Sequence, residues 1–424
     1  MLGSNLIATF CNLVIGIVLS RNLGPGGFGV LSALLVLPMI MVGFVQLGIR
    51  RSAIYYLGNK QFDENKTVST ILLLLFLSSL AGILLTGAGF LFYRSGDFQW
   101  ILILLVLISI PMKLALQYLG GIFLGKQQIG RSNTLVWIPA LMNLCFVALF
   151  VWFLKMQVLG ALIAIFLSDL IVSAEALRKI SGEFTVSFKL QKQIIQSILR
   201  LGILYALSFF IMQLNYRADL ILLKQLSTNE QVGFYSLANY ISEQLWHIPL
   251  AVEAVILSHT ANASDHDLLK MNVAKVFRLS ILAGIGGVLA IYLIAPILVP
   301  LLFSAKFTGS IPLIRNILPG IFLIILFRIL NSHLAGLGKP MVAIYIFLPA
   351  LILNILLNLL WIPSHGAMGA VWATNCSYAL GAIVFLFIYC RVIKINIYTL
   401  FSYKKTDFHF SKRRSIDHYG NTSL

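Results

Sequence analysis

The chain has 424 residues, of which 59% are apolar and 11% are charged, and its formal net charge is +17. Soluble globular proteins carry about 25% charged residues and cannot bury so large an apolar fraction, so the composition excludes a soluble protein. The apolar runs are continuous rather than alternating, which excludes a transmembrane β-barrel and predicts helical membrane spans.

The apolar runs predict twelve spans, each long enough to cross a hydrocarbon layer about 30 Å thick. Their expected extents are 2–20, 29–48, 67–93, 98–122, 133–154, 157–177, 200–223, 232–258, 279–303, 314–335, 341–362 and 367–390. Between the first two lie Gly24, Pro25, Gly26 and Gly27. These residues do not sustain a helix, so we expect a tight turn at residues 21–29.

The basic residues are distributed unevenly over the predicted links. Most of the 31 lysines and arginines fall in alternate links and in the C-terminal tail, on the side of the membrane to which both ends of the chain belong. By the positive-inside rule, both termini face the cytoplasm. Most of the net charge then serves topology and attraction to anionic lipid, and no nucleic-acid partner is expected.

Three short motifs recur in the same order in the two halves of the chain. Gly29-Val30-Leu31-Ser32 matches Gly233-Phe234-Tyr235-Ser236, Leu124-Gly125-Lys126 matches Leu337-Gly338-Lys339, and residues 160–164 match residues 369–373. Two six-span repeats of the same orientation predict a pseudo-two-fold axis along the membrane normal. Transporters built in this way bind cargo between the repeats.

These features predict an all-α polytopic membrane protein with two parallel six-helix repeats around a central cavity. We expect an N-terminal bundle at residues 1–180, a cytoplasmic amphipathic linker at 181–199, a C-terminal bundle at 200–394 and a basic tail at 395–424. The linker's helical part is expected at residues 192–199, and the tail is expected to be disordered.

At these motifs the chain resembles the Wzx-type oligosaccharide flippases of the polysaccharide biosynthesis family. The wider superfamily includes lipid II flippases and multidrug exporters. Four stretches carry the resemblance: residues 21–25 with Gly29, Asp219 with residues 233–238, residues 336–340, and Asn354 and Asn358 with residues 366–370. The resemblance covers about residues 1–395.

The resemblance implies translocation of an undecaprenyl-diphosphate-linked oligosaccharide across a bacterial cytoplasmic (inner) membrane, for surface polysaccharide such as O-antigen. It implies alternating access, with a polysaccharide polymerase or ligase acting on the product. A missing amphipathic lead-in before the first span leaves open whether the native start lies upstream of Met1. The lipid II flippases carry two further spans that are not predicted here.

Charges within predicted spans need a reason, since each costs about 2.5–3.5 kcal/mol on insertion scales. Arg328, Lys113 and Arg217 are candidates to bind the anionic diphosphate, because Arg and Lys both bind phosphate oxygens. For Arg328 and Arg217, the alternative to cargo binding is a structural ion pair, and Asp169 in the sixth span is one possible partner. For Lys113, the alternative is a locally unwound, solvated segment of the span. Arg50, beside Arg51, serves diphosphate capture or positive-inside anchoring. Asn5 and Asn12 share one face of the first span, where sugar contact and close helix packing are equally consistent.

A second set of residues is acidic. Glu243 and Glu253 lie near His247 in the eighth span, and Glu243 and His247 are four residues apart. A carboxylate beside an imidazole in a low-dielectric cavity can exchange protons, so this set and Asp219 are candidates for proton or sodium coupling. The alternatives are ion pairs with Arg328 or Arg217 and, for Asp219, a turn-stabilising contact near the outer end of its span.

The chain shows no nucleotide-binding loop, no serine–histidine–acid pattern and no metal-ligand spacing, so no cofactor, no metal and no enzymatic activity are expected. Two alternatives to a flippase remain. A multidrug cation exporter shares the fold but favours an acidic cavity, and a polysaccharide polymerase or ligase usually has a large external loop.

Overall fold

The computed structural model describes residues 2–93, 96–185, 191–247, 266–339 and 341–403, with isolated positions 249, 253, 256, 260 and 407. This part of the chain is helical and contains no strand. The long helices are α1 (Leu2–Val45), α3 (Glu64–Tyr93), α4 (Trp100–Gly125), α5 (Ile129–Val147), α6 (Gln157–Glu183), α7 (Lys192–Leu226), α10 (His266–Leu298), α11 (Ser310–Gly336) and α12 (Met341–Ile393). The shorter ones are α2 (Ile49–Gly58), α8 (Asn229–Ser242), α13 (Ile397–Phe401), η1 (Ala148–Phe153), η2 (Glu243–Trp246), η3 (Val299–Phe303) and η4 (Ala305–Phe307).

Eight helical stretches in the described residues are long and apolar enough to cross a membrane, which confirms the helical membrane protein. Two of them, Gly3–Gly58 and Met341–Ile393, are 56 and 53 residues long, more than twice what a bilayer needs. Each has a break inside: Gly24 has φ 65° in α1 and Gly366 has φ 54° in α12. Glycine adopts this left-handed backbone without a Cβ clash, so both breaks fall at glycines.

The predicted turn at residues 21–29 therefore appears as a kink between two helical segments. The exact number of twelve spans stays a prediction, and part of the predicted eighth span lies outside the described residues.

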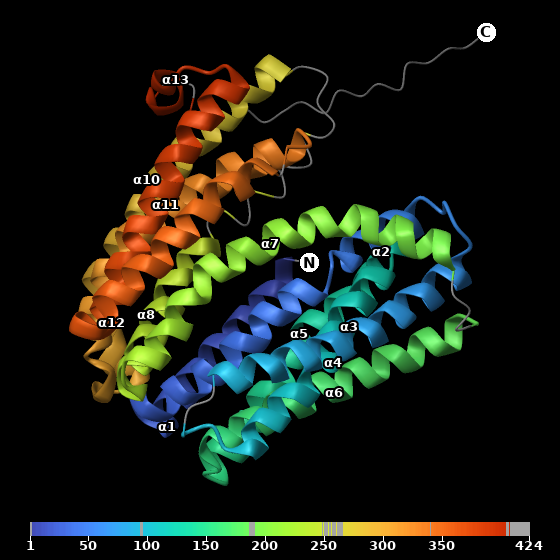
Figure 1. The fold of residues 1–424 in the computed structure, drawn as a ribbon, viewed down its shortest axis with the longest axis horizontal. Helices are drawn as coiled ribbons and strands as arrows, with labels where there is room; N and C mark the ends of the chain where they lie inside the picture. Colours follow the sequence, from blue (N-terminus) through green and yellow to red (C-terminus); the bar gives the residue numbers. More distant parts are fainter. Residues whose placement is uncertain are drawn as a thin grey trace.

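Two helical bundles form a V (Figure 1). The helices α1–α6 make one arm, and α8, α10, α11 and α12 make the other. The arms meet where the kink of α1 lies beside α8, and they diverge toward α2 in one arm and α13 in the other. We call the meeting point the apex and the opposite side the open end.

The apex contains a reciprocal contact between the repeats. A Cβ added to Gly29 would lie 2.0 Å from the Asn229 carbonyl oxygen, and one added to Gly233 would lie 2.0 Å from the Pro25 carbonyl oxygen. Gly29 and Gly233, like Pro25 and Asn229, are 204 residues apart in the chain. The same two positions of each repeat thus contact one another, as a pseudo-two-fold axis requires.

The helix α7 connects the two arms. Its first residues pack on the N-terminal arm, where Ser52 Oγ donates to the Ile198 carbonyl at 2.9 Å and Tyr56 to the Ser197 carbonyl at 3.2 Å. The helix then runs without a break to Leu226 beside α8. The amphipathic segment expected at residues 192–199 is therefore the first part of α7, and the predicted boundary at residue 200 falls inside a helix.

The chain after α12 returns to the second bundle. Residues Ile397–Phe401 form α13, and the Phe401 and Phe277 rings pack edge to face at 5.6 Å. The prediction of a disordered tail is wrong for this segment, because buried contacts with α10 fix it. The remainder of the predicted tail lies outside the described residues, except Asp407.

Candidate functional site

Two cavities adjoin one another between the arms. The apex cavity, of about 540 Å³, is lined by Thr9, Asn12, Ile15, Gly16, Leu19, Phe28, Leu31, Ser32, Leu35, Val36, Met39, Ile165, Arg217, Leu220, Ser236, Asn239, Tyr240, Glu243, Gln244 and His247. The mouth cavity, of about 650 Å³, lies nearer the open end and is lined by Leu35, Pro38, Met39, Val42, Gly43, Gln46, Gly48, Arg50, Arg51, Ser109, Lys113, Leu116, Gln117, Asp169, Ala206 and Gln213. They share Leu35 and Met39 of α1, so together they form one path along that helix. Volumes of this size are typical of ligand sites.

The mouth cavity has a surplus of positive charge. Arg50, Arg51 and Lys113 line it, and Asp169 is the one carboxylate among the described residues of its wall. The Lys113 ammonium lies 3.9 Å from an Asp169 oxygen, and 38% of the Lys113 side chain is exposed. Lys113 therefore retains access to a ligand. The structure brings Arg50 and Lys113, which are distant in sequence, to the wall of one cavity, as the diphosphate hypothesis expects.

The apex cavity is electrically balanced. Arg217 donates two parallel hydrogen bonds to the Glu243 carboxylate, at 2.9 and 3.0 Å. This fork geometry is the strongest form of an arginine–carboxylate pair. Arg217 and Glu243 are therefore paired with each other, which is the alternative that the sequence left open for both residues. His247 lines the same cavity.

The rest of the apex cavity is lined with amides and hydroxyls. Asn12 lies on its wall, and the Tyr240 hydroxyl donates to the Asn12 carbonyl oxygen at 2.7 Å. Asn239, Gln244 and Ser236 add polar groups from α8 and η2. Asn5 is exposed and lines neither cavity, so the first span contributes Asn12 but not Asn5 to this wall.

Arg328 is paired within the second bundle. It donates to both Glu253 carboxylate oxygens, at 2.6 and 3.2 Å, and its guanidinium lies 5.7 Å from the Trp246 ring centroid. Arg328 lines neither of the two cavities. The structure thus shows the structural ion pair that the sequence left as the alternative to a cargo contact.

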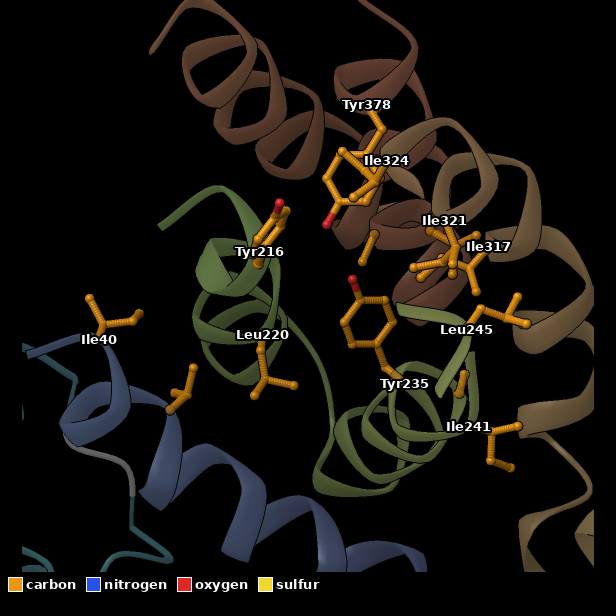
Figure 2. Packing of buried hydrophobic residues seen from close by; sticks show 14 of the residues in the cluster. Ile40, Tyr216, Leu220, Tyr235, Ile241, Leu245, Ile317, Ile321, Ile324 and Tyr378 are labelled. Atoms are coloured by element: carbon orange, nitrogen blue, oxygen red, sulfur yellow. The ribbon is translucent and has the colours of Figure 1, made fainter. Parts of the chain in front are cut away.

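Asp219 joins three helices in the second bundle. Its carboxylate accepts from the Tyr235 hydroxyl of α8, from Thr374 Oγ1 of α12 at 2.9 Å and from the Leu220 amide at 2.8 Å. Figure 2 shows the hydroxyls of Tyr216, Tyr235 and Tyr378 directed toward a common space. Asp219 is fully buried in this polar centre, so it does not stabilise a turn at the membrane surface.

Asn215 lies one turn before Asp219 on α7 and is also fully buried. Neither its amide oxygen nor its amide nitrogen has a hydrogen-bond partner among the described residues. An unsatisfied buried polar group calls for a water or an ion. The polar centre around Asp219 therefore adjoins a buried amide whose hydrogen bonds are not made by the described residues, whereas the carboxylates of Glu243 and Glu253 are paired with arginines.

The apex is closed by contacts that the sequence did not assign to the site. Arg21 donates to the Leu302 carbonyl at 2.8 Å and to the Leu301 carbonyl at 2.5 Å, across the two arms. Lys224 of α7 lies 2.7 Å from Asp97 of the first arm. Arg21 and Lys224 both lie on the predicted outer side, where the positive-inside rule leaves few basic residues. Their unusual position is the sequence signal that would have identified them.

These features define a helical membrane protein with two bundles around a partly cationic cavity that is closed at one end. The chain belongs to the family described as polysaccharide biosynthesis protein, whose sequence profile matches residues 1–248. No curated protein matches the chain in sequence.

The fold is that of the transporters of the MOP superfamily. A multidrug resistance MATE family transporter of this superfamily, in an inward-facing conformation, is similar to the chain with a TM-score of 0.77 and 17% identity, over 91% of this chain and 94% of that one. The lipid II flippase MurJ, in an inward closed conformation, is similar with a TM-score of 0.74 and 14% identity, over 94% of this chain and 88% of that one. An outward-facing MATE family transporter gives a TM-score of 0.67 and 16% identity, over 92% and 94%. At these identities the likeness concerns the fold alone.

Proposed function

We propose that the protein is a flippase that moves a lipid-linked, undecaprenyl-diphosphate-bound oligosaccharide across the bacterial cytoplasmic membrane by alternating access. The observation that carries the proposal is the mouth cavity, whose described wall holds Arg50 and Lys113 beside Arg51, with Asp169 as the one carboxylate among those described residues. A diphosphate needs such a surplus, because its charge must be compensated when it leaves water.

The arrangement of the two cavities supports binding of the two parts of the cargo, the diphosphate and the sugar, in different cavities. Arg50 and Lys113 bind the diphosphate in the mouth cavity, and the amides and hydroxyls around Asn12 bind sugar in the apex cavity. With both termini cytoplasmic, the open end faces the cytoplasm, where such a cargo is assembled. The contacts of Arg21 and Lys224 then hold the outer side closed until the cargo is bound. A polysaccharide polymerase is the expected partner that uses the product.

A cation exporter of the same fold is the second candidate, and the same observation counts against it. Positive charge in the mouth cavity repels a cationic drug. The Arg217–Glu243 pair removes the carboxylate that such a drug requires in the apex cavity.

A deletion strain separates these functions. We expect the strain to accumulate undecaprenyl-linked repeats inside the cell and to lose surface polysaccharide, and we expect the wild-type gene to restore it. Loss of polysaccharide chain length alone would favour a polymerase. Sensitivity to cationic drugs with normal surface polysaccharide would favour the exporter.

Coupling to a proton or sodium gradient is assigned to Asp219, because it lies in the buried polar centre beside the unsatisfied Asn215. In proteoliposomes, we expect Asp219→Asn to reduce gradient-driven transport at least ten-fold while equilibrium exchange of cargo continues. Gradient-driven transport at the wild-type rate would contradict this role. Glu253→Gln is the comparison, since the Glu253 carboxylate is bound by Arg328 and makes no contact with Asp219 among the described residues.

A further inference from the structure

The basic side chains at the open end differ in whether they form an ion pair with a carboxylate. In the N-terminal arm, several basic side chains at this end form ion pairs with carboxylates of the same arm. The pairs are Lys126–Glu64, Arg131–Glu183 and Arg178–Glu175.

In the C-terminal arm, the contrast with these pairs lies at the end of α12. The sequence has no acidic residue from position 268 to position 406. Arg391 and Lys394 at the end of α12 are exposed, and neither forms an ion pair with a residue that the structure describes. Two uncompensated cations therefore lie at the point where the chain leaves the last bundle helix.

The segment that follows is held firmly against α10. Arg278 is 1% exposed and donates two hydrogen bonds of 2.7 Å to the Asp407 carboxylate. Its Nη1 also donates to the Thr399 carbonyl at 2.8 Å, and the Tyr403 hydroxyl donates to the Arg278 carbonyl at 3.1 Å. A bidentate pair this deeply buried fixes the position of α13.

The fixed segment presents aromatic side chains outward. Tyr398 is 79% exposed, and Phe401 and Tyr403 are each 42% exposed. Figure 1 places α13 at the open end of the second bundle, beside α10. The outer face of α10 is apolar and exposed from Leu282 to Ile297, as expected of a face in contact with lipid tails, and Phe277, which packs on Phe401, lies just before this run. The aromatic side chains of α13 therefore lie at the level of the lipid headgroups, where Tyr and Trp are enriched.

We propose that Arg391, Lys394 and the exposed aromatic side chains of α13 bind the headgroup of an anionic phospholipid in the leaflet at the open end. The guanidinium and ammonium groups contact the phosphate, and Tyr398 and Phe401 lie among the glycerol and upper acyl groups. The site thus anchors the C-terminal arm to anionic lipid.

Lipid binding by the purified full-length protein tests this site. Native mass spectrometry in neutral detergent compares bound phosphatidylglycerol with bound phosphatidylcholine of the same acyl chains. We expect Arg391→Gln with Lys394→Gln to weaken phosphatidylglycerol binding about thirty-fold, since each basic residue near an anionic surface contributes about a factor of five. The control variant Arg178→Gln removes a cation that is already paired and should leave the binding unchanged.

Equal phosphatidylglycerol binding by the wild type and the double variant would overturn the proposal, as would displacement of the bound lipid by a ten-fold excess of inorganic phosphate.

A second measurement does not depend on these cations. A spin label at Tyr398→Cys, in a background without the four native cysteines, should be reached by oxygen in preference to a water-soluble relaxing agent in bilayers. Accessibility equal to that of a label at Lys60→Cys, which replaces an exposed residue beyond α2, would also overturn it.

Discussion

The mouth cavity and the apex cavity lie along the same helix but differ in charge balance. In the mouth cavity, Arg50, Arg51 and Lys113 face one carboxylate, and the closest Lys113–Asp169 distance is a loose 3.9 Å. In the apex cavity, Arg217 is bound to Glu243 through two hydrogen bonds of ordinary length. A cation in a cavity wall indicates an anionic ligand only when the protein has not already neutralised its charge. The comparison assigns charge recognition to the mouth and neutral polar contacts to the apex.

Neutralising the mouth cavity should have the largest effect. We expect Arg50→Gln with Lys113→Gln to reduce transport of the lipid-linked oligosaccharide about 100-fold, because each charge-assisted contact contributes about 1.5 kcal/mol, roughly ten-fold in binding. Transport into proteoliposomes, with thermal unfolding as the check on folding, measures this. Lys155→Gln, at an exposed position outside both cavities, is the matched control. Normal transport by the double variant would remove the basis of the comparison.

Breaking the apex pair should act on stability first. We expect Glu243→Gln to lower the free energy of unfolding by about 3 kcal/mol, since it leaves the Arg217 guanidinium without its counter-charge. Thermal unfolding in detergent measures the loss, and Arg217→Met with Glu243→Gln should recover most of it. Failure of the double variant to recover stability would show that the pair does more than balance charge.

Preventing the close contact at the apex should have a moderate effect. A Cβ at position 29 would overlap the Asn229 carbonyl, so we expect Gly29→Ala to shift the population toward an open apex and to slow transport several-fold. Labelling of a cysteine at Phe28 with an impermeant reagent reports the opening. Gly26→Ala is the control, because a Cβ there meets nothing within 4 Å. Equal labelling in both variants would show that the apex tolerates the added atom.

Removing one contact across the apex should have the smallest effect. Arg21→Gln removes two hydrogen bonds to the Leu301 and Leu302 carbonyls at an exposed site, and we expect an increase in apex labelling of only a few-fold. The combination with Lys224→Gln should exceed either single change. A combined effect no larger than that of Arg21→Gln would show that the Lys224–Asp97 pair does not help to hold the apex closed.

Much of the architecture could be predicted because it follows from local sequence. Long apolar runs specify helical spans, and Gly24 marks the break in α1 because a positive φ favours glycine. The repeat was visible because matching turns recur at a nearly constant spacing. The reciprocal contact of Gly29 and Gly233 shows the reason: each repeat approaches the other's backbone too closely for any side chain.

The site was harder to predict, because similar residues ended in different roles. Lys113 and Arg217 both appear as single cations in apolar helices, yet one is loosely paired in a cavity and the other is tightly held. Arg328, the third candidate cation of this kind, lines neither cavity. No local pattern shows which carboxylate lies opposite, because Glu243 and Glu253 are 26 and 75 residues away from their partners.

The sequence alone determined that this is a helical membrane protein built from two similar halves, because hydrophobicity and turn chemistry act over a few residues. The tertiary structure decided which charges remain available and where the path is closed. Charge compensation and closure depend on groups that only the packing of distant helices brings within hydrogen-bond distance.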